Sequence, residues 1–166
     1  MQRIGDLEIN EDAGFAERGW QIQKAAWLLM LLFAVGALLG LTGSGPLSRA
    51  TVAADQFRLT YDRFDRISTS SELTIQFDAR AVHGGAVRVW LNREYLNSFR
   101  VESIPPEPES VVSSADRLIY TFRALENQPG EITFRLSADA RAFGLVRGEA
   151  GVIAGGNIGF QQFVYP

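Results

Sequence analysis

Few side chains in this sequence could carry out acid-base or metal chemistry, and they are scattered. His83 is the only histidine, and it stands in the turn His83-Gly84-Gly85 between two predicted strands. A hydrolytic triad or a histidine-bearing metal site needs partners oriented around the imidazole, and Asp78 is the only acid close to it in sequence. We therefore expect His83 to be an exposed turn residue.

Asp62 and Asp65 could form a pair of carboxylates for general acid-base catalysis, but an arginine follows each of them. A carboxylate beside a guanidinium is held ionised, which suits a salt-bridged surface more than proton transfer. We expect these two residues to contribute to packing near a membrane and not to catalysis.

Other ligand motifs are incomplete. Asp116 and Asp139 stand apart, whereas calcium loops cluster Asp and Asn at alternating spacing. The glycine-rich run at 151–156 has no following Lys-Ser/Thr and opens no helix, so it predicts a hairpin or a bulge. The chain has no cysteine, which excludes a disulfide framework and any cysteine-based metal or redox site. The sequence thus predicts no catalytic residue, no cofactor site and no metal site.

One predicted surface combines arginine with an aromatic residue. Arg88, Arg123 and Arg135 are expected on the outward faces of their strands, with Trp90 beside Arg88. This composition is typical of interfaces, and the partner would be an acidic protein surface, anionic lipid headgroups or a polyanionic envelope polymer. The alternative is a solvated sheet face on which the arginines pair with acids of neighbouring strands, such as Glu72.

The elements that would position these side chains are strands. From Phe57 onward apolar and polar residues alternate, and Leu73, Ile75 and Phe77 share one face of such a segment. Turns rich in glycine and proline separate the segments, and no helical stretch of convincing length intervenes. The predicted strands are 57–61, 72–78, 87–92, 95–101, 118–123, 132–137, 151–153 and 158–165. We expect an all-β fold, an antiparallel immunoglobulin-like sandwich of seven or eight strands, with a small barrel as the competing architecture.

An apolar block precedes the strands. Between Lys24 and Arg49 there is no charged side chain, and this stretch contains LLMLLFAVGALLGL. About 20 apolar residues, each rising about 1.5 Å, cross a hydrocarbon core of about 30 Å. We predict an uncleaved transmembrane helix at 23–43 that anchors the chain in the lipid bilayer. Gly36 and Gly40 form a GxxxG motif that could pack two such helices into a homo-oligomer.

A cleavable signal peptide is the alternative for the apolar block. Ala53 and Ala54 could serve as the cleavage site, but they lie well past the apolar block, and the stretch before it is long and net acidic. Lys24, the only lysine, abuts the predicted hydrocarbon edge, while the far side opens on uncharged GSGPLS. We therefore predict a cytoplasmic amino end and an extracytoplasmic carboxyl-terminal bulk.

The predicted organisation has four parts. They are an acidic cytoplasmic tail at 1–22, a transmembrane helix at 23–43, a linker at 44–56 and an extracytoplasmic β-sandwich domain at 57–166. The motifs GDLEINED at 5–12, GPLS at 45–48, VWLN at 89–92 and PEPE at 106–109 resemble a group of uncharacterised bacterial single-pass inner-membrane proteins. This resemblance implies a bacterial envelope setting, with the sandwich on the periplasmic side, and assigns no catalytic residue.

Two functions from different classes fit these features. The first is a binding or assembly module that presents a face to another membrane or envelope protein, as an accessory subunit of a complex. The second is an envelope enzyme or small-ligand receptor with a site at loop ends around His83, Asp116 or Asp139. We favour the first, because catalysis needs polarised titratable groups that this chain scarcely supplies. Nucleic acid is not an expected partner, because the net charge is -3 and there is no basic stripe.

Overall fold

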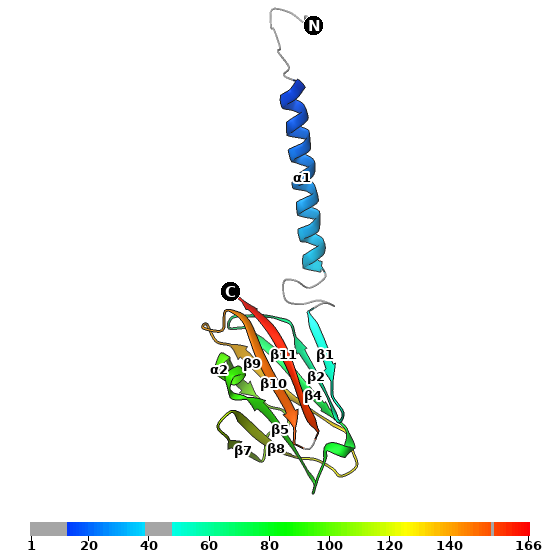
Figure 1. Ribbon diagram of the computed structural model, residues 1–166, viewed down its shortest axis with the longest axis vertical. Helices are drawn as coiled ribbons and strands as arrows, with labels where there is room; N and C mark the ends of the chain where they lie inside the picture. The colour runs from blue at the N-terminus through cyan, green and yellow to red at the C-terminus, as the bar shows by residue number, and fades with distance from the viewer. Residues whose placement is uncertain (1–12, 39–47, 154) are drawn as a thin grey trace, which may run out of the picture. The chain divides into compact units, whose positions relative to one another are not determined.

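The computed structural model describes residues 13–38, 48–153 and 155–166 of the 166-residue chain, which divides into two compact units. The first unit contains helix α1, Ala13–Leu38, and the second contains a β-sandwich (Figure 1). The predicted order of an apolar helix followed by a strand-built domain is therefore confirmed.

Helix α1 contains the stretch Gly19–Leu38, which is long and apolar enough to cross a membrane, with a mean hydropathy of 1.5 over its most apolar window. At about 1.5 Å per residue these 20 residues span about 30 Å. Every residue from Gly19 to Val35 is exposed, and apolar side chains lie on all sides of the helix. The helix starts within the segment predicted as a tail. Of the GxxxG pair, Gly36 lies near the end of α1, and Gly40 lies outside the described residues.

The second unit is a sandwich of two sheets. One sheet has five strands in the order β1-β2-β4-β9-β6, and the other has six in the order β3-β11-β10-β5-β8-β7. The strands are β1 Arg49–Ala53, β2 Phe57–Asp62, β3 Phe64–Arg66, β4 Ser70–Phe77, β5 Ala86–Asn92, β6 Phe99–Ser103, β7 Ser110–Ser113, β8 Arg117–Arg123, β9 Gly130–Ala138, β10 Gly144–Val152 and β11 Gly156–Tyr165. Two short helices complete it, the 3-10 helix η1 at Ala79–Ala81 and the α-helix α2 at Arg93–Ser98.

Alternating side chains build the core between the sheets. In β4, Leu73 and Ile75 are buried and face Phe134 and Ile132 of β9 in the antiparallel register. Tyr120 of β8, in the other sheet, meets the Phe134 ring edge-on with centroids 5.2 Å apart. Buried rings in this geometry hold the two sheets together beyond their area burial.

The sandwich prediction is confirmed, but the number of strands was too low and the barrel alternative is wrong. The structure has eleven strands, divided five and six, unlike the four-and-three division of a seven-stranded immunoglobulin constant domain. One pair, β3 with β11, is parallel, so the sandwich is not wholly antiparallel. The segment predicted as a linker contains β1, which pairs with β2 along its whole length.

Segments without alternation were predicted least well. All residues of β7 are exposed, and β1 buries only Ala50, so neither strand shows a period of two. The predicted strand at 95–101 is instead α2 followed by β6, because Tyr95 and Phe99 are both buried at helical spacing. Most of β10 was missed because glycine at 144, 148 and 151 interrupts its apolar pattern.

Gly148 gives a test of packing between β10 and β11. A Cβ at Gly148 would lie 2.3 Å from Cζ of the buried Phe160 ring, whereas one at Gly159 would meet nothing within 4 Å. We expect Gly148→Ala to lower the free energy of unfolding by about 1–3 kcal/mol, because the ring must move in a filled core. Gly159→Ala, the matched control, should stay within about 0.5 kcal/mol of the natural chain. Urea unfolding of the full chain in mild detergent, followed by near-UV circular dichroism, measures both, and equal effects would contradict this packing.

Candidate functional site on the six-stranded sheet

A groove of about 1040 Å³ lies on the outer side of the six-stranded sheet and is open to solvent. Helix α2, strands β5, β10 and β11 and the turn between β7 and β8 form its walls. We call it the Trp90 groove. Its lining residues are Tyr61, Trp90, Asn92, Arg93, Glu94, Asn97, Ala115, Asp116, Arg147, Gly148, Glu149, Gly159, Phe160 and Gln161.

The groove exists because β5 leaves the sheet before β10 does. Strand β10 pairs with β5 only over Ala150–Val152, and after Asn92 the chain turns into α2. The Asn92 side chain covers the point of separation, since its Oδ1 accepts a hydrogen bond of 2.8 Å from the backbone N–H of Glu149. The first half of β10 therefore faces a helix across the groove instead of a paired strand.

Trp90 contributes an indole ring to the groove. Its side chain lies on the same outward face of β5 as Arg88, yet only 8% of the residue is exposed. Gly151, its register partner on β10, makes room for the ring, because a Cβ there would lie 2.6 Å from the indole. The Arg117 guanidinium lies over the ring, 4.5 Å from its centroid, in a cation-π contact.

Tyr95 fixes the helical wall of the groove. This residue of α2 is fully buried, and its hydroxyl donates a hydrogen bond of 2.6 Å to Oε1 of Gln162. The Gln162 amide nitrogen in turn donates to the backbone carbonyl of Asp62 at 2.7 Å. The Tyr95 ring also packs against Phe99 and Phe160, with centroids 4.6 and 5.0 Å apart. Burial raises the pKa of Tyr95 well above its ordinary value, so its hydroxyl remains a donor.

Arg93 joins α2 to the turn between β7 and β8. Its backbone N–H donates to the carbonyl of Asp116 at 2.8 Å, and its guanidinium donates to the carbonyl of Ser114 at 2.7 Å. Its buried Nε has no hydrogen-bond partner among the described residues. These contacts join two walls of the groove.

Charges of both signs line the groove. The Arg117 guanidinium donates to Asp116 at 2.8 Å, and this hydrogen bond lowers the pKa of Asp116. Arg147 and Glu149 project outward from β10, and Glu94 is exposed on α2. The groove therefore offers ionic and amide groups to a polar partner, with one aromatic ring among them.

The residues predicted as an interaction surface do not lie on one surface. Arg88 and Arg123 share the outer face of the six-stranded sheet, and Arg123 pairs with Glu109 at 2.7 Å. Arg135 lies on β9 in the five-stranded sheet and pairs with Glu72 at 3.3 Å. Alternation correctly placed each arginine outward, but it does not reveal which sheet a strand joins.

The three loop-end residues of the alternative prediction are also not brought together. His83 precedes β5, whereas Asp116 lies beyond the other end of that strand, about 20 Å away for seven residues. Asp139 follows β9, where its carboxylate accepts a hydrogen bond from the backbone N–H of Arg141. His83 is exposed, as predicted. Among the residues that the structure describes, no three His, Asp or Glu side chains are placed to hold a metal ion.

The prediction that Asp65 lies on a salt-bridged surface was wrong, because this carboxylate is buried. Only 4% of Asp65 is exposed, its Oδ1 accepts a 2.8 Å hydrogen bond from the Arg66 backbone N–H, and loss of hydration raises its pKa. Partial burial also raises the pKa of Asp62, and Arg49, 3.9 Å away, offsets part of this. Arg66, the following residue, does not hold the Asp65 carboxylate ionised, because the side chains of adjacent strand residues point to opposite faces.

Sequence reasoning missed most of the groove. Arg93, Asn97 and Glu149 were not singled out, because α2 and the first part of β10 were not predicted. Asn92 and Gln161 lie in predicted strands, but alternation alone does not mark them as lining a groove. A local signal for α2 was present, since Asn92 is the residue before the helix and Glu94 lies in its first turn.

Comparisons with known proteins leave the family open. No family model matches the chain, and no curated protein matches it. Among solved structures, one that is similar is the cohesin module of a family 33 glycoside hydrolase from Clostridium perfringens. That match has 8% identity and a TM-score of 0.41, and it covers 68% of this chain and 98% of the module. The likeness is distant and says nothing about function. The resemblance to uncharacterised bacterial inner-membrane proteins stays a prediction.

Asp65 predicts a pH dependence of stability. Because its pKa is raised in the native state, the unfolded chain ionises first as pH rises above the ordinary value of 3.8. Asp65 therefore lowers the free energy of unfolding progressively as pH increases through the interval up to its native pKa. The variant Asp65→Asn lacks this ionisation, so we expect its stability relative to the natural chain to increase from pH 3.8 upward.

Chemical denaturation of the full chain in detergent between acidic and neutral pH measures this difference. Asp116→Asn is the control, since the lowered pKa of Asp116 predicts the opposite trend, with the natural chain gaining stability as pH rises. A stability difference between Asp65→Asn and the natural chain that is independent of pH would contradict the burial of an ionising carboxyl group.

Proposed function

We propose that this protein is a membrane-anchored binding module that holds a polar segment of another envelope or inner-membrane protein in the Trp90 groove. In this proposal α1 is an uncleaved anchor in a bacterial inner membrane, the amino end is cytoplasmic and the sandwich is extracytoplasmic. The protein would act as an accessory or partner subunit of a complex and not as an enzyme.

The observation that carries the proposal is the combination of rigid walls and polar lining in the groove. Tyr95 attaches α2 to the sheet through a buried hydrogen bond and Arg93 attaches it to the turn between β7 and β8 through an exposed one, so the walls of the groove are joined in the absence of a partner. Binding to a preformed site loses little free energy to the ordering of its side chains and backbone. Exposed ionic groups around a mostly covered tryptophan resemble the composition of a protein interface, where charged rims surround an aromatic centre.

The anchor is supported by the surface of α1. From Gly19 to Val35 all residues are exposed within their unit, and most of them are apolar. Exposing this apolar surface to water is unfavourable, whereas exposing it to the hydrocarbon of a bilayer is favourable. A helix of this length near the amino end is compatible with a signal anchor and with a signal peptide. The long acidic stretch before it favours the anchor.

The orientation rests on charge placement. Lys24 lies toward the amino end of the apolar stretch, and its Nζ is 4.9 Å from the ring of Trp20. A cation and an interfacial tryptophan together are typical of one membrane boundary, and basic residues favour the cytoplasmic side. This charge placement favours an extracytoplasmic sandwich.

A small-ligand receptor is the second candidate. The groove volume of about 1040 Å³ is at the upper end of ligand sites, which commonly occupy about 300–1,000 Å³, and polar side chains converge on it. The openness of the groove to solvent favours a macromolecular partner over a small molecule that must be enclosed.

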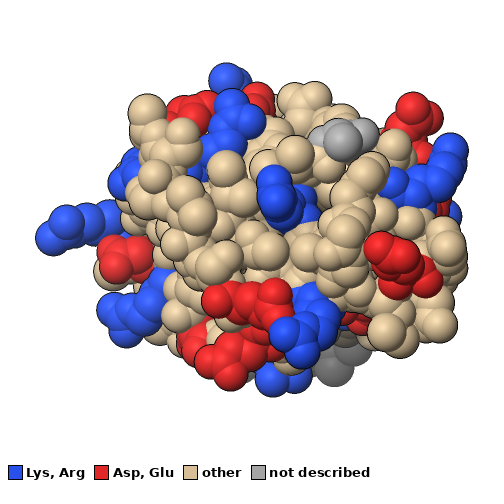
Figure 2. Space-filling model, turned by 90° about the horizontal axis from the view of Figure 1, so that it is seen from below, with Lys and Arg blue, Asp and Glu red and all other residues tan. Residues whose placement is uncertain are grey.

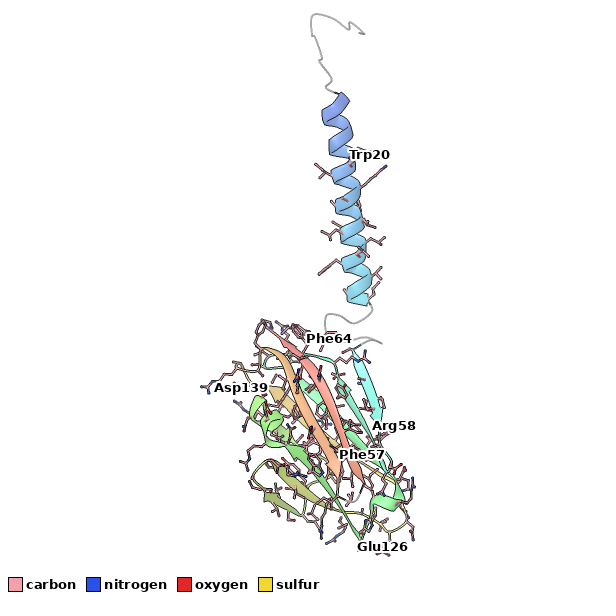
Figure 3. All side chains as sticks on the ribbon, in the orientation of Figure 1. Trp20, Phe57, Arg58, Phe64, Glu126 and Asp139 are labelled. Carbon is pink, nitrogen blue, oxygen red and sulfur yellow. The ribbon has the colours of Figure 1, made fainter. Side chains whose placement is uncertain are left out.

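Site-specific crosslinking tests the groove as a protein-binding site. A photoreactive benzoylphenylalanine at Asn97, which lines the groove, should give a discrete adduct with an envelope protein in the native host. The matched control is Arg58, exposed on the five-stranded sheet (Figure 3), which should give none. Adding Glu149→Arg should reduce the Asn97 adduct at least about fivefold, equivalent to about 1 kcal/mol, by reversing a groove charge. Equal adducts at Asn97 and Arg58 would contradict the proposal, and a co-purifying small molecule with no adduct would favour the receptor.

Cysteine labelling tests the topology. The chain has no natural cysteine, so Glu126→Cys provides a single thiol on the sandwich and Gln2→Cys one on the amino tail. We expect a membrane-impermeant maleimide to label Cys at 126 in intact spheroplasts and Cys at 2 only after lysis. The reverse pattern would show that the orientation is inverted, and a mature chain that begins near Ala54 would show that the apolar segment is cleaved.

A further inference from the structure

An apolar patch covers the end of the six-stranded sheet at which β11 finishes. Leu145 of β10 and Phe163 of β11 are register partners on the outer face, 57% and 42% exposed. Phe143, just before β10, is 66% exposed, and the half-buried Phe64 of β3 is the register partner of Phe163 on its other side. We call these four residues the end patch. Clusters of exposed large apolar side chains on a soluble surface usually mark a contact with another phase or molecule.

The end patch lies where the chain enters the sandwich from the apolar helix. The Arg63 backbone N–H donates to the carbonyl of Ser48 at 2.6 Å, and Phe64 is the next residue. In Figure 3 Phe64 lies at one end of the sandwich and Glu126 at the other.

Chain length ties this end to the helix. Nine residues, 39–47, separate α1 from Ser48, and a chain extends by at most about 3.6 Å per residue, so the connection reaches about 35 Å. Strand β11 alone, with ten residues, is about 33 Å long. The chain from α1 thus joins the sandwich at the patch-bearing end, at Ser48, and the far end lies about a strand length from that point.

Arginines accompany the end patch. Arg63, Arg66 and Arg141 are exposed at this end, and none of them forms an ion pair with any residue that the structure describes. Asp139, the acid closest in sequence to Arg141, is half-buried in the same loop.

Charges of both signs occur at the patch-bearing end, where Asp62 beside Arg63 pairs with Arg49 at 3.9 Å, and at the opposite end. Figure 2 views the molecule from that side and shows acidic and basic side chains interspersed, and Asp78 and Arg80, for example, pair at 3.5 Å. Aromatic side chains flanked by unpaired arginines suit the headgroup region of an anionic membrane, where rings enter the boundary and guanidinium groups meet phosphates.

We propose that the end patch, Phe64, Phe143, Leu145 and Phe163, rests in the headgroup region of the bilayer that α1 crosses, with Arg63, Arg66 and Arg141 on its anionic lipids. This inference rests on the membrane anchor of the proposed function. The contact restricts the tilt of the sandwich and keeps the Trp90 groove facing along the membrane surface, where another membrane protein would meet it.

Fluorescence quenching in a bilayer tests the contact. The full chain carrying Leu145→Cys is labelled with an environment-sensitive dye and reconstituted into vesicles of phosphatidylethanolamine and phosphatidylglycerol with spin-labelled lipid. We expect lipid quenching and a blue-shifted emission, since an interfacial side chain sits about 5–10 Å into the headgroup boundary. Leu125→Cys is the matched control, because Leu125 is equally apolar, is 69% exposed and lies at the far end next to Glu126. It should show neither change.

Three further outcomes overturn the inference in distinguishable ways. If alkaline carbonate extracts the chain from the membrane, both the proposed membrane anchor and the proposed bilayer contact are contradicted. Retention of the chain in the membrane with an unquenched dye at residue 145 would overturn the bilayer contact alone. A blue shift at residue 145 without lipid quenching would show that a second copy or another protein covers the patch. Adding Phe143→Ser and Phe163→Ser should abolish quenching at residue 145 if the assignment is correct, with near-UV circular dichroism confirming the native fold.

Discussion

The two-residue period of the strands is the constraint on which the sandwich depends. Once Leu73, Ile75 and Phe134 point between the sheets, each neighbouring residue must point outward. The same alternation places Arg88 and Trp90 on the outer face of the six-stranded sheet. The core and the outer surface are therefore two results of a single physical rule, and a slip of one residue would exchange them.

The groove arises where this regular pattern stops. Strand β5 separates from β10 after Asn92, and α2 occupies the space that another paired strand would have filled. Buried hydrogen bonds from Tyr95 to Gln162 and on to the Asp62 carbonyl hold the helix in place. An unpaired polar atom in the core lowers the free energy of unfolding. These paired hydrogen bonds therefore stabilise the junction between α2 and the sheet and favour this arrangement over others. The absence of a side chain at Gly151 then leaves room for the Trp90 indole.

The two ends of the sandwich have different surfaces, and the chain that comes from the apolar helix enters at one of them, at Ser48. The end near Ser48 exposes Phe143, Leu145 and Phe163, whereas acidic and basic side chains are interspersed at the far end (Figure 2) and an ion pair between Arg49 and Asp62 lies at the near end. The Trp90 groove lies on the outer face between the two ends, which leaves it accessible to a neighbouring protein.

The apolar helix and the sandwich could be predicted from the sequence, because both follow from the order of apolar and polar residues along short stretches. Alternation in 72–78, 87–92, 118–123 and 132–137 located four central strands and the outward direction of Arg88, Arg123 and Arg135. Strands with no buried face, such as β7, left no such trace. Three features could not be predicted in this way: Arg135 belongs to a different sheet, Asp65 is buried, and the Arg117 guanidinium lies over Trp90. Each of these depends on contacts between residues far apart in the chain, and a local pattern contains no information about them.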